Sequence, residues 1–406
     1  MAIRFDSPPS GPAFGPTVPA EPGGRGAPDT PRELRIRFVG SGSEYFRIWI
    51  VNLLLTVVTV GLYYPFAKVR RLRYFHGATE LDGQPLAFHA DPWKMLRGYL
   101  LVGAMLALYS VAGQFSPTAG LVAFAIVALV WPALWHSSLR FRLANTSWRG
   151  LRLRYTGTVQ QAYRAMALPL LASGLVLAVA LFAPDGEPRT PGAPPTAADW
   201  ALIATPLLVM LLGTPLVLWL LKRQQHDHYA FGSEHTRFEP GLGRFVRFWL
   251  AAVGFTLLVV LVFVAATLGV FFVLGQSGRN PMGAPLLLAV TLLVDYVLVF
   301  SIVSGYFIAR LQNLVWNGTR SEHLRFDSRL RARELISVWF TNTLFVIVTL
   351  GLYIPFARVA SARLRLQSVR VQASTDLDAL VAAAPERDES AAGDAAGDLF
   401  GFDLGL

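Results

Sequence analysis

The chain has 406 residues, of which 53% are hydrophobic and 15% are charged, and its formal net charge is +10. A soluble globular protein carries roughly 25% charged residues, so this composition excludes an ordinary soluble domain. The chain has no cysteine. Disulfides, thiolate metal sites and a cysteine nucleophile are therefore excluded as well.

The positive charge lies mostly on arginines that stand beside apolar runs rather than in one patch. Basic residues in such positions bind anionic lipid headgroups and fix the topology of a membrane protein. The expected partner is therefore the lipid bilayer with its anionic headgroups, and no nucleic-acid partner is expected. The pattern indicates no cofactor and names no protein partner.

Two tails of different composition flank an apolar middle region. Residues 1–31 are rich in Pro and Gly, which predicts a disordered tail. Residues 373–406 are predicted to form a disordered acidic tail, with carboxylates at Asp376, Asp378, Glu386, Asp388, Glu389, Asp394, Asp398 and Asp403. The first apolar run begins only near Tyr45, so no cleaved signal peptide is expected. Residues 32–372 are the predicted membrane domain.

Eight apolar segments divide this domain. Each has about 20 residues or more, which is enough to cross the hydrocarbon core of a bilayer. The segments are 44–64, 95–114, 119–140, 161–183, 200–221, 246–275, 285–310 and 334–355.

The loops between these segments predict the orientation. Loops 140–164, 222–247 and 310–333 are rich in arginine, whereas 184–199 and 276–284 hold few basic residues. By the positive-inside rule, the first three face the cytoplasm and the last two face the periplasm of a bacterial inner membrane. Both termini are then expected in the cytoplasm.

The first and last segments do not fit a simple crossing, because basic residues flank both ends of each. We predict that these two segments enter from the cytoplasm, bend and return, while the six central segments cross fully. The bends are expected at Gly61, Pro65, Gly351 and Pro355. The alternative is eight true crossings with both tails outside.

The ends of the domain repeat each other. Residues 44–73 align without gaps to residues 334–363, and the shared core reads TVGLYYPFAKV in the first copy and TLGLYIPFARV in the second. A shorter repeat, SEHTRF at 233–238, recurs as SEHLRF at 321–326. Such self-similarity predicts an internal structural repeat.

Short segments of alternating leucine and arginine precede several helices and end in an aromatic residue, as at 34–38 and 151–155. This alternation predicts short strands. The predicted fold class is therefore an all-α polytopic membrane bundle with short β-hairpins on its cytoplasmic side. It would have six full crossings plus two segments that re-enter or cross.

Three stretches, GLYYPFAKVRRLRYF (61–75), NTSWRG (145–150) and GLYIPFARV (351–359), resemble the YjgN family of bacterial inner-membrane proteins, a domain of unknown function (DUF898). The resemblance covers the predicted membrane domain. Phe66 and Phe356 stand where relatives often have Trp. The resemblance implies a location and an architecture, but no substrate, cofactor or catalytic residue.

The repeated motif and the basic residues after it form the first candidate site. They can line a pore or hold the phosphates of anionic lipids. The plainer interpretation is a helix break with interfacial anchors. The candidate residues are Gly61, Tyr63, Pro65, Phe66, Lys68 and Arg70 in the first copy, and Gly351, Tyr353, Pro355, Phe356 and Arg358 in the second.

Asp295 is the most suggestive single residue, since it lies inside the apolar run LLVDYVLVF at 292–300. A carboxylate at that depth of a membrane is costly and often functional, for example as a proton or cation relay. The structural alternative is that an arginine, a hydroxyl or a backbone group satisfies Asp295.

Acid–histidine pairs give a third candidate. Glu234 and His235 recur as Glu322 and His323, and HDH stands at 226–228. These residue types can bind a metal or transfer protons. Repetition favours an architectural role for the two pairs, and the triplet lacks the spacing of a known metal motif. No metal site is therefore predicted.

Three classes of function remain open. A secondary transporter or channel would explain the broken, repeated segments and Asp295. A non-catalytic envelope protein that binds lipid or a protein partner would explain the basic loops and the acidic tail. A membrane enzyme has the least support, because no catalytic constellation is evident. If Asp295 faces an internal cavity, transport is favoured; if it faces a tight protein contact, the second class is favoured.

Overall fold

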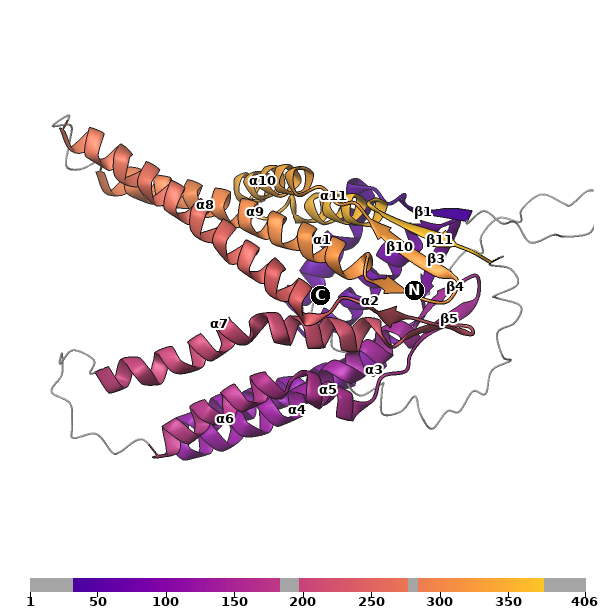
Figure 1. The fold of residues 1–406 in the computed structure, drawn as a ribbon, viewed down its shortest axis with the longest axis horizontal. Helices are drawn as coiled ribbons and strands as arrows, with labels where there is room; N and C mark the ends of the chain where they lie inside the picture. The colour runs from indigo at the N-terminus through magenta and orange to yellow at the C-terminus, as the bar shows by residue number, and fades with distance from the viewer. Residues whose placement is uncertain (1–31, 183–196, 277–283, 376–406) are drawn as a thin grey trace, which may run out of the picture.

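The chain forms five consecutive units, each with a helical hairpin between two β-strands (Figure 1). The computed structural model describes residues 32–182, 197–276 and 284–375. The predicted tails therefore lie outside the described residues, apart from 373–375.

The first unit contains β1 (Arg32–Phe38), α1 (Gly42–Val58), α2 (Tyr64–Gly77) and β2 (Thr79–Leu81). The second contains β3 (Gln84–Phe88), α3 (Pro92–Phe115), α4 (Pro117–Ala144) and β4 (Thr146–Trp148). The third contains β5 (Leu151–Tyr155), α5 (Val159–Ala165), α6 (Ala167–Phe182), α7 (Ala197–His226) and β6 (Tyr229–Phe231). After β7 (Glu234–His235), the fourth contains β8 (Arg237–Phe238), α8 (Leu242–Gln276), α9 (Ala284–Trp316) and β9 (Thr319–Arg320). The fifth contains β10 (Leu324–Ser328), α10 (Ala332–Val348), α11 (Ile354–Gln367) and β11 (Val369–Ala373).

The strands of all units join into one antiparallel sheet of eleven strands, in the order β7-β6-β5-β4-β3-β2-β1-β11-β10-β9-β8. Leu34 of β1 lies opposite Val371 of β11, which joins the first unit to the last. The two edge strands, β7 and β8, are separated along the chain by Thr236 alone, so the sheet is nearly closed into a barrel.

The predicted all-α bundle with only short β-hairpins is therefore wrong. The strands are two to seven residues long. Strands this short carry a weak signal in sequence, and their pairing between units depends on contacts between distant segments.

The barrel is filled by apolar side chains. Successive residues of a strand point to opposite faces, so the alternation of leucine and arginine places the leucines inside and the arginines outside. Leu34, Trp148 and Val371 are buried together, and Phe231 and Phe326 pack against them.

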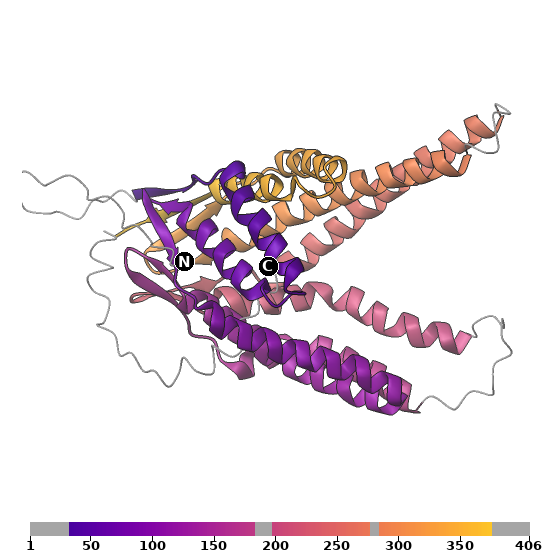
Figure 2. The ribbon, with the colours of Figure 1, turned by 180° about the vertical axis from the view of Figure 1, so that it is seen from behind.

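The helices form a ring that extends from one end of the barrel. Neighbouring units touch where α2 meets α3, α4 meets α6, α7 meets α8, α9 meets α10 and α11 meets α1. Figure 1 shows α4 and α6 reaching away from the sheet as one arm and α8 with α9 as another, with α7 between them; Figure 2 shows the same arrangement from behind.

Five helices among the described residues are long and apolar enough to cross a membrane: Pro92–Phe115, Thr118–Ala144, Ala204–His226, Leu242–Phe272 and Leu286–Trp316. A sixth span exists only if α5 and α6, which are bent by 63° at their junction, count as one. The predicted count of six full crossings plus two further segments differs from this finding. The break between α5 and α6 falls inside the segment predicted at 161–183.

The first and last units carry short hairpins. Helices α1 and α10 have 17 residues and α2 and α11 have 14, whereas α8 has 35 and α9 has 33. Strand β1 pairs with β2, and β10 pairs with β11, so each short hairpin leaves and rejoins the sheet at adjacent strands. At their tips Val60, Gly61, Leu350 and Gly351 have φ of 51°, 89°, 49° and 93°. Val60 and Leu350 are 92% and 93% exposed.

Candidate functional site

A cavity of about 1190 Å³ lies inside the ring of helices, next to the end of the barrel from which the helices extend. It is lined by residues of α2, α4, α9, α10 and α11 and by strands of the first, second and fifth units. A second cavity of about 820 Å³, lined mainly by α7, α8 and α9, shares Gln312, Trp316 and Arg365 with the first. We call the two together the central cavity.

The ionisable side chains that line the central cavity are basic apart from one histidine and one tyrosine. They are Arg71, Arg142, Lys222, His226, Tyr229, Arg358 and Arg365. Among the described lining residues none is acidic. Arg142 and Arg365 both lie within electrostatic range of Lys222. We call Arg142, Lys222 and Arg365 the cationic cluster.

Hydrogen bonds to glutamines hold two members of the cluster in place. The Arg365 Nε donates to Gln312 Oε1 at 2.9 Å, and Gln312 Nε2 donates back to the Arg365 carbonyl at 3.0 Å. Gln312 is itself buried. The Lys222 Nζ donates to Gln225 Oε1 at 3.2 Å. Burial lowers the pKa of Arg365, as expected for a cation withdrawn from water.

The remaining wall of the central cavity is largely apolar. Trp316 and Trp339 line it together with Phe300, Val346 and Ile354. Val346 and Ile354 lie near the tip of the last short hairpin, whereas the cationic cluster lies near the sheet. The cavity thus has a basic end and an apolar end, which suits an anion that carries hydrocarbon.

Most residues of the GLYxPFA motif do not line this cavity but pack each short hairpin against its neighbour. Phe66 contacts Trp93 of the second unit edge-on, with ring centroids 5.0 Å apart. Phe356 contacts Phe46 of the first unit at 5.9 Å. Each phenylalanine also stacks on the motif tyrosine, Tyr63 or Tyr353.

The other candidate residues of the motif are buried or hydrogen-bonded within the hairpins, with one exception. Pro65 and Pro355 are fully buried, and Lys68 is buried. Arg70 donates to Asn52 Oδ1 at 3.2 Å within its own hairpin. Arg358 lines the cavity and donates to the Tyr45 hydroxyl at 3.4 Å. Of the predicted motif residues, only Arg358 therefore belongs to the central cavity.

Asp295 lies between two helices rather than in the cavity. Its carboxylate accepts a hydrogen bond from the Thr267 hydroxyl of α8, and the side chain is half-buried. It does not line the central cavity. The Thr267 hydroxyl is therefore a hydrogen-bond partner of this carboxylate.

The structure does not join the two repeated acid–histidine pairs, Glu234–His235 and Glu322–His323, into one four-residue site. Glu234 instead contacts His323, at the place where the edge strands β7 and β8 leave the sheet unclosed, which we call the seam. Glu234 Oε1 lies 2.7 Å from His323 Nδ1, and the Ser321 hydroxyl donates to Glu234 Oε2 at 2.6 Å. His235 and Glu322 are exposed.

The ionisation of this contact follows from its geometry. Burial alone would raise the pKa of Glu234, but hydrogen bonds from Ser321 and His323 outweigh it, and the pKa is lowered. The hydrogen bond to Glu234 raises the pKa of His323. The two groups therefore form an ion pair that ties β7 to the turn between β9 and β10.

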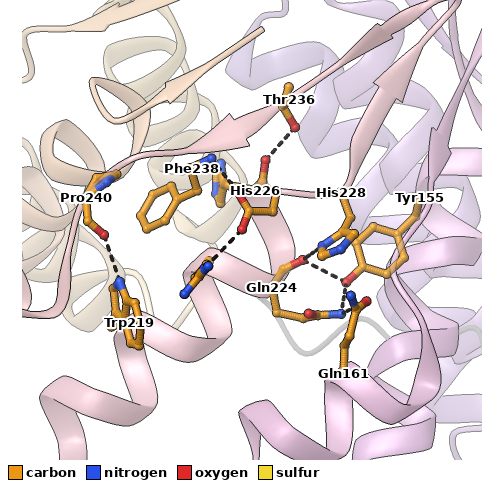
Figure 3. Close-up of polar contacts among 11 residues, drawn as sticks. Tyr155, Gln161, Trp219, Gln224, His226, His228, Thr236, Phe238 and Pro240 are labelled. Carbon is orange, nitrogen blue, oxygen red and sulfur yellow. Dashed lines mark hydrogen bonds and ion pairs between the residues drawn. The ribbon is translucent and has the colours of Figure 1, made fainter.

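The HDH triplet is part of the fold. Figure 3 shows the His226 carbonyl accepting a hydrogen bond from the Thr236 hydroxyl and His228 bonded to the Gln224 carbonyl. His226 Nδ1 lies 3.0 Å from the Thr319 hydroxyl, and His228 Nδ1 lies 2.9 Å from the Gln224 carbonyl. Asp227 accepts from the Phe238 backbone N–H at the start of the next unit. Within the described part of the chain, no group of three His, Asp or Glu residues is placed to hold a metal ion.

Sequence reasoning missed the cationic cluster because its members resemble ordinary topology-setting residues at helix ends. One signal was available. Gln312 and Lys222 are polar residues in the last turns of long apolar helices, where a polar side chain often holds another polar group.

Five helices suited to a bilayer define a membrane protein, and comparison with known proteins gives its family. The family model for "Bacterial protein of unknown function (DUF898)" matches residues 33–399, so the chain belongs to this family, as the sequence motifs predicted. "Inner membrane protein YjgN" of Salmonella typhimurium is 25% identical over 358 residues, which are 84% of this chain and 89% of that protein. The protein of the same name from Escherichia coli K12 is 28% identical over 119 residues, 29% of this chain and 30% of the relative. No solved structure matches.

Proposed function

We propose that this protein is a multi-pass inner-membrane protein that binds an anionic amphiphile, such as a phospholipid, in its central cavity. The observation that carries the proposal is the cationic cluster, placed at one end of a largely apolar cavity whose described lining residues include no acid. Partly desolvated cations are stable only with counter-charges or hydrogen bonds. A phosphate suits Arg142 and Arg365 because a guanidinium offers several donors in one plane.

The depth of the cluster supports a lipid headgroup as the anion. Arg142, Lys222 and Arg365 lie two, four and two residues before the ends of α4, α7 and α11, each of which leads into a strand. At 1.5 Å per residue this places them within about 6 Å of the helix ends. With the sheet on the cytoplasmic side, as the positive-inside rule favours, the cluster lies at the level of the inner headgroups.

A transporter or channel is less favoured. The apolar core of the barrel covers the sheet end of the central cavity. Asp295, the residue considered as a proton or cation relay, accepts a hydrogen bond from Thr267 outside that cavity. Both features favour retention of a bound amphiphile over a continuous path through the ring.

The test is thermal unfolding of the purified protein in neutral detergent, titrated with phosphatidylglycerol, phosphatidylcholine or inorganic phosphate. A ligand of the folded state at 100 times its Kd stabilises by about 2.7 kcal/mol. We expect phosphatidylglycerol to raise the Tm and phosphatidylcholine to leave it nearly unchanged. Lys222→Gln should remove most of the rise.

Arg247→Gln is the matched control, because Arg247 is an exposed cation near the start of α8 that does not line the central cavity. It should keep the full response. An equal response of Lys222→Gln and wild type to phosphatidylglycerol would refute the site. A full rise with inorganic phosphate alone would show a soluble anion in place of the lipid.

A further inference from the structure

Three arginines stand in one row on the outer face of the barrel. Arg320 of β9 lies directly opposite Arg237 of β8 on one side and Arg325 of β10 on the other. Residues directly opposite in an antiparallel sheet point to the same face. All three are exposed, so their guanidinium groups share the outer surface. We call this row the arginine ladder.

The ladder holds more positive than negative charge. Directly opposite residues in antiparallel strands have Cβ atoms about 4.5–5.5 Å apart, and like charges there destabilise the sheet. One carboxylate, Glu239, pairs with Arg320. Beyond Arg325 the row continues with Gln372 of β11. A chain segment rich in carboxylates would relieve the repulsion.

Such a segment begins beside the ladder. Strand β11 ends at Ala373, opposite Leu324, and the Ser374 backbone N–H donates to the His323 carbonyl at 2.9 Å. The chain therefore leaves the described structure within a few residues of Arg325. Asp376 follows two residues after Ser374, a reach of about 7 Å in an extended chain.

We propose that the acidic segment 376–406 binds the arginine ladder and covers this face of the barrel. The segment holds eight carboxylate side chains and one arginine, Arg387. Its first carboxylates, Asp376 and Asp378, can reach the ladder without a long connection. An anionic membrane surface or an acidic protein would then have to displace the chain's own segment before contacting the ladder.

The test uses a single spin label, which the absence of cysteine makes straightforward. Ser390→Cys in the full-length protein, labelled with a nitroxide in phosphatidylcholine nanodiscs, should give a spectrum with an immobilised component. Raising the salt from about 0.1 M to about 1 M shortens the Debye length from about 10 Å to about 3 Å, so that component should be lost.

Charge-matched variants separate the ladder from general electrostatics. Arg237→Gln with Arg325→Gln leaves the Arg320–Glu239 pair in place and should remove the immobilised component. Arg37→Gln with Arg152→Gln removes the same charge from exposed positions on β1 and β5 and should leave it. Equal spectra for both double variants would overturn the proposal, as would a label that is mobile at low salt in the wild type. Immobilisation that requires anionic lipid in the nanodisc would assign the segment to the membrane instead.

Discussion

The short hairpins and the long hairpins start from the same barrel and return to it, but they differ in length, and we expect their tips to lie at different depths in the membrane. Helix α1 spans about 25 Å and α8 about 52 Å at 1.5 Å per residue, from their 17 and 35 residues. The hydrocarbon core of a bilayer is about 30 Å thick. The short hairpins reverse at a left-handed turn with exposed Val60 or Leu350 at the tip. We therefore expect apolar runs of similar appearance to differ in whether they cross.

The largest expected difference between the two kinds of hairpin is in thiol accessibility. Ser116→Cys stands between α3 and α4, at the far end of a long hairpin. It should react with an impermeant thiol reagent in intact spheroplasts. Gln372→Cys, exposed on β11, should react only after lysis, because we place the sheet in the cytoplasm.

Val60→Cys completes this comparison at the tip of a short hairpin. It should resist the reagent before and after lysis, since the tip would lie within the bilayer. If Val60→Cys reacts from outside as readily as Ser116→Cys, the short hairpins cross the membrane, and the difference in depth is lost.

The contact between a long and a short hairpin depends on Gly305. A Cβ at this position of α9 would lie 2.7 Å from the Ile336 Cγ1 and 3.1 Å from the Ile336 Cα of α10, so the backbone of α10 would have to move as well as the side chain. Gly305→Leu should therefore separate the two helices and cost about 3 kcal/mol of folding free energy. Thermal unfolding followed by size-exclusion chromatography measures this. Gly254→Leu on α8 is the control, because nothing lies within 4 Å of a Cβ there.

Several of these features could be predicted from sequence, and others could not. The family was readable because GLYYPF and GLYIPF are specific strings, and the break at Gly61 because glycine and proline interrupt an apolar run. The barrel was not readable, since most of its pairings join residues dozens of positions apart, as Leu153 with Phe231, and the pairing of Leu34 with Val371 joins the two ends of the domain. The cationic cluster was missed for the same reason. Arg142, Lys222 and Arg365 come from three units and meet only when the ring of helices closes.

Glycine substitutions should have opposite effects in the two kinds of hairpin. Gly351 has φ of +93°, where an L side chain is strained, so Gly351→Ala should cost about 1–2 kcal/mol. Gly254 has ordinary helical geometry and open space around it. Gly254→Ala should therefore stabilise by up to about 1 kcal/mol. Chemical unfolding in detergent measures both. A loss of similar size at both positions would mean that the turn at Gly351 carries no special requirement.

The barrel is also closed in two different ways. Between the two short hairpins, β1 and β11 pair through their backbones. At the seam between the third and fourth units, the edge strands do not pair, and Glu234 binds Ser321 and His323 instead. Backbone pairing does not titrate near neutral pH, whereas this ion pair does. The two closures should therefore respond differently to pH.

The sign of that response follows from the two pKa shifts. The lowered pKa of Glu234 means that its contribution to stability is present above the ordinary value of 4.5 and is lost as the pH falls through the folded-state value. The raised pKa of His323 means that its contribution is complete below 6.5 and is lost as the pH rises through the folded-state value. The ion pair should stabilise most between these limits.

Glu234→Gln should therefore cost more at about pH 5.5 than at about pH 8.5. The expected difference is of order 1 kcal/mol, because His323 is partly exposed and water screens the pair. Thermal unfolding of wild type and Glu234→Gln at both pH values measures it, with Glu322→Gln as the exposed control from the same repeated motif. A cost that is independent of pH would mean that Glu234 holds the seam only through groups that do not titrate, the Ser321 hydroxyl and the His323 backbone N–H. The seam would then be closed by neutral hydrogen bonding, and it would differ from the β1–β11 closure in geometry but not in charge.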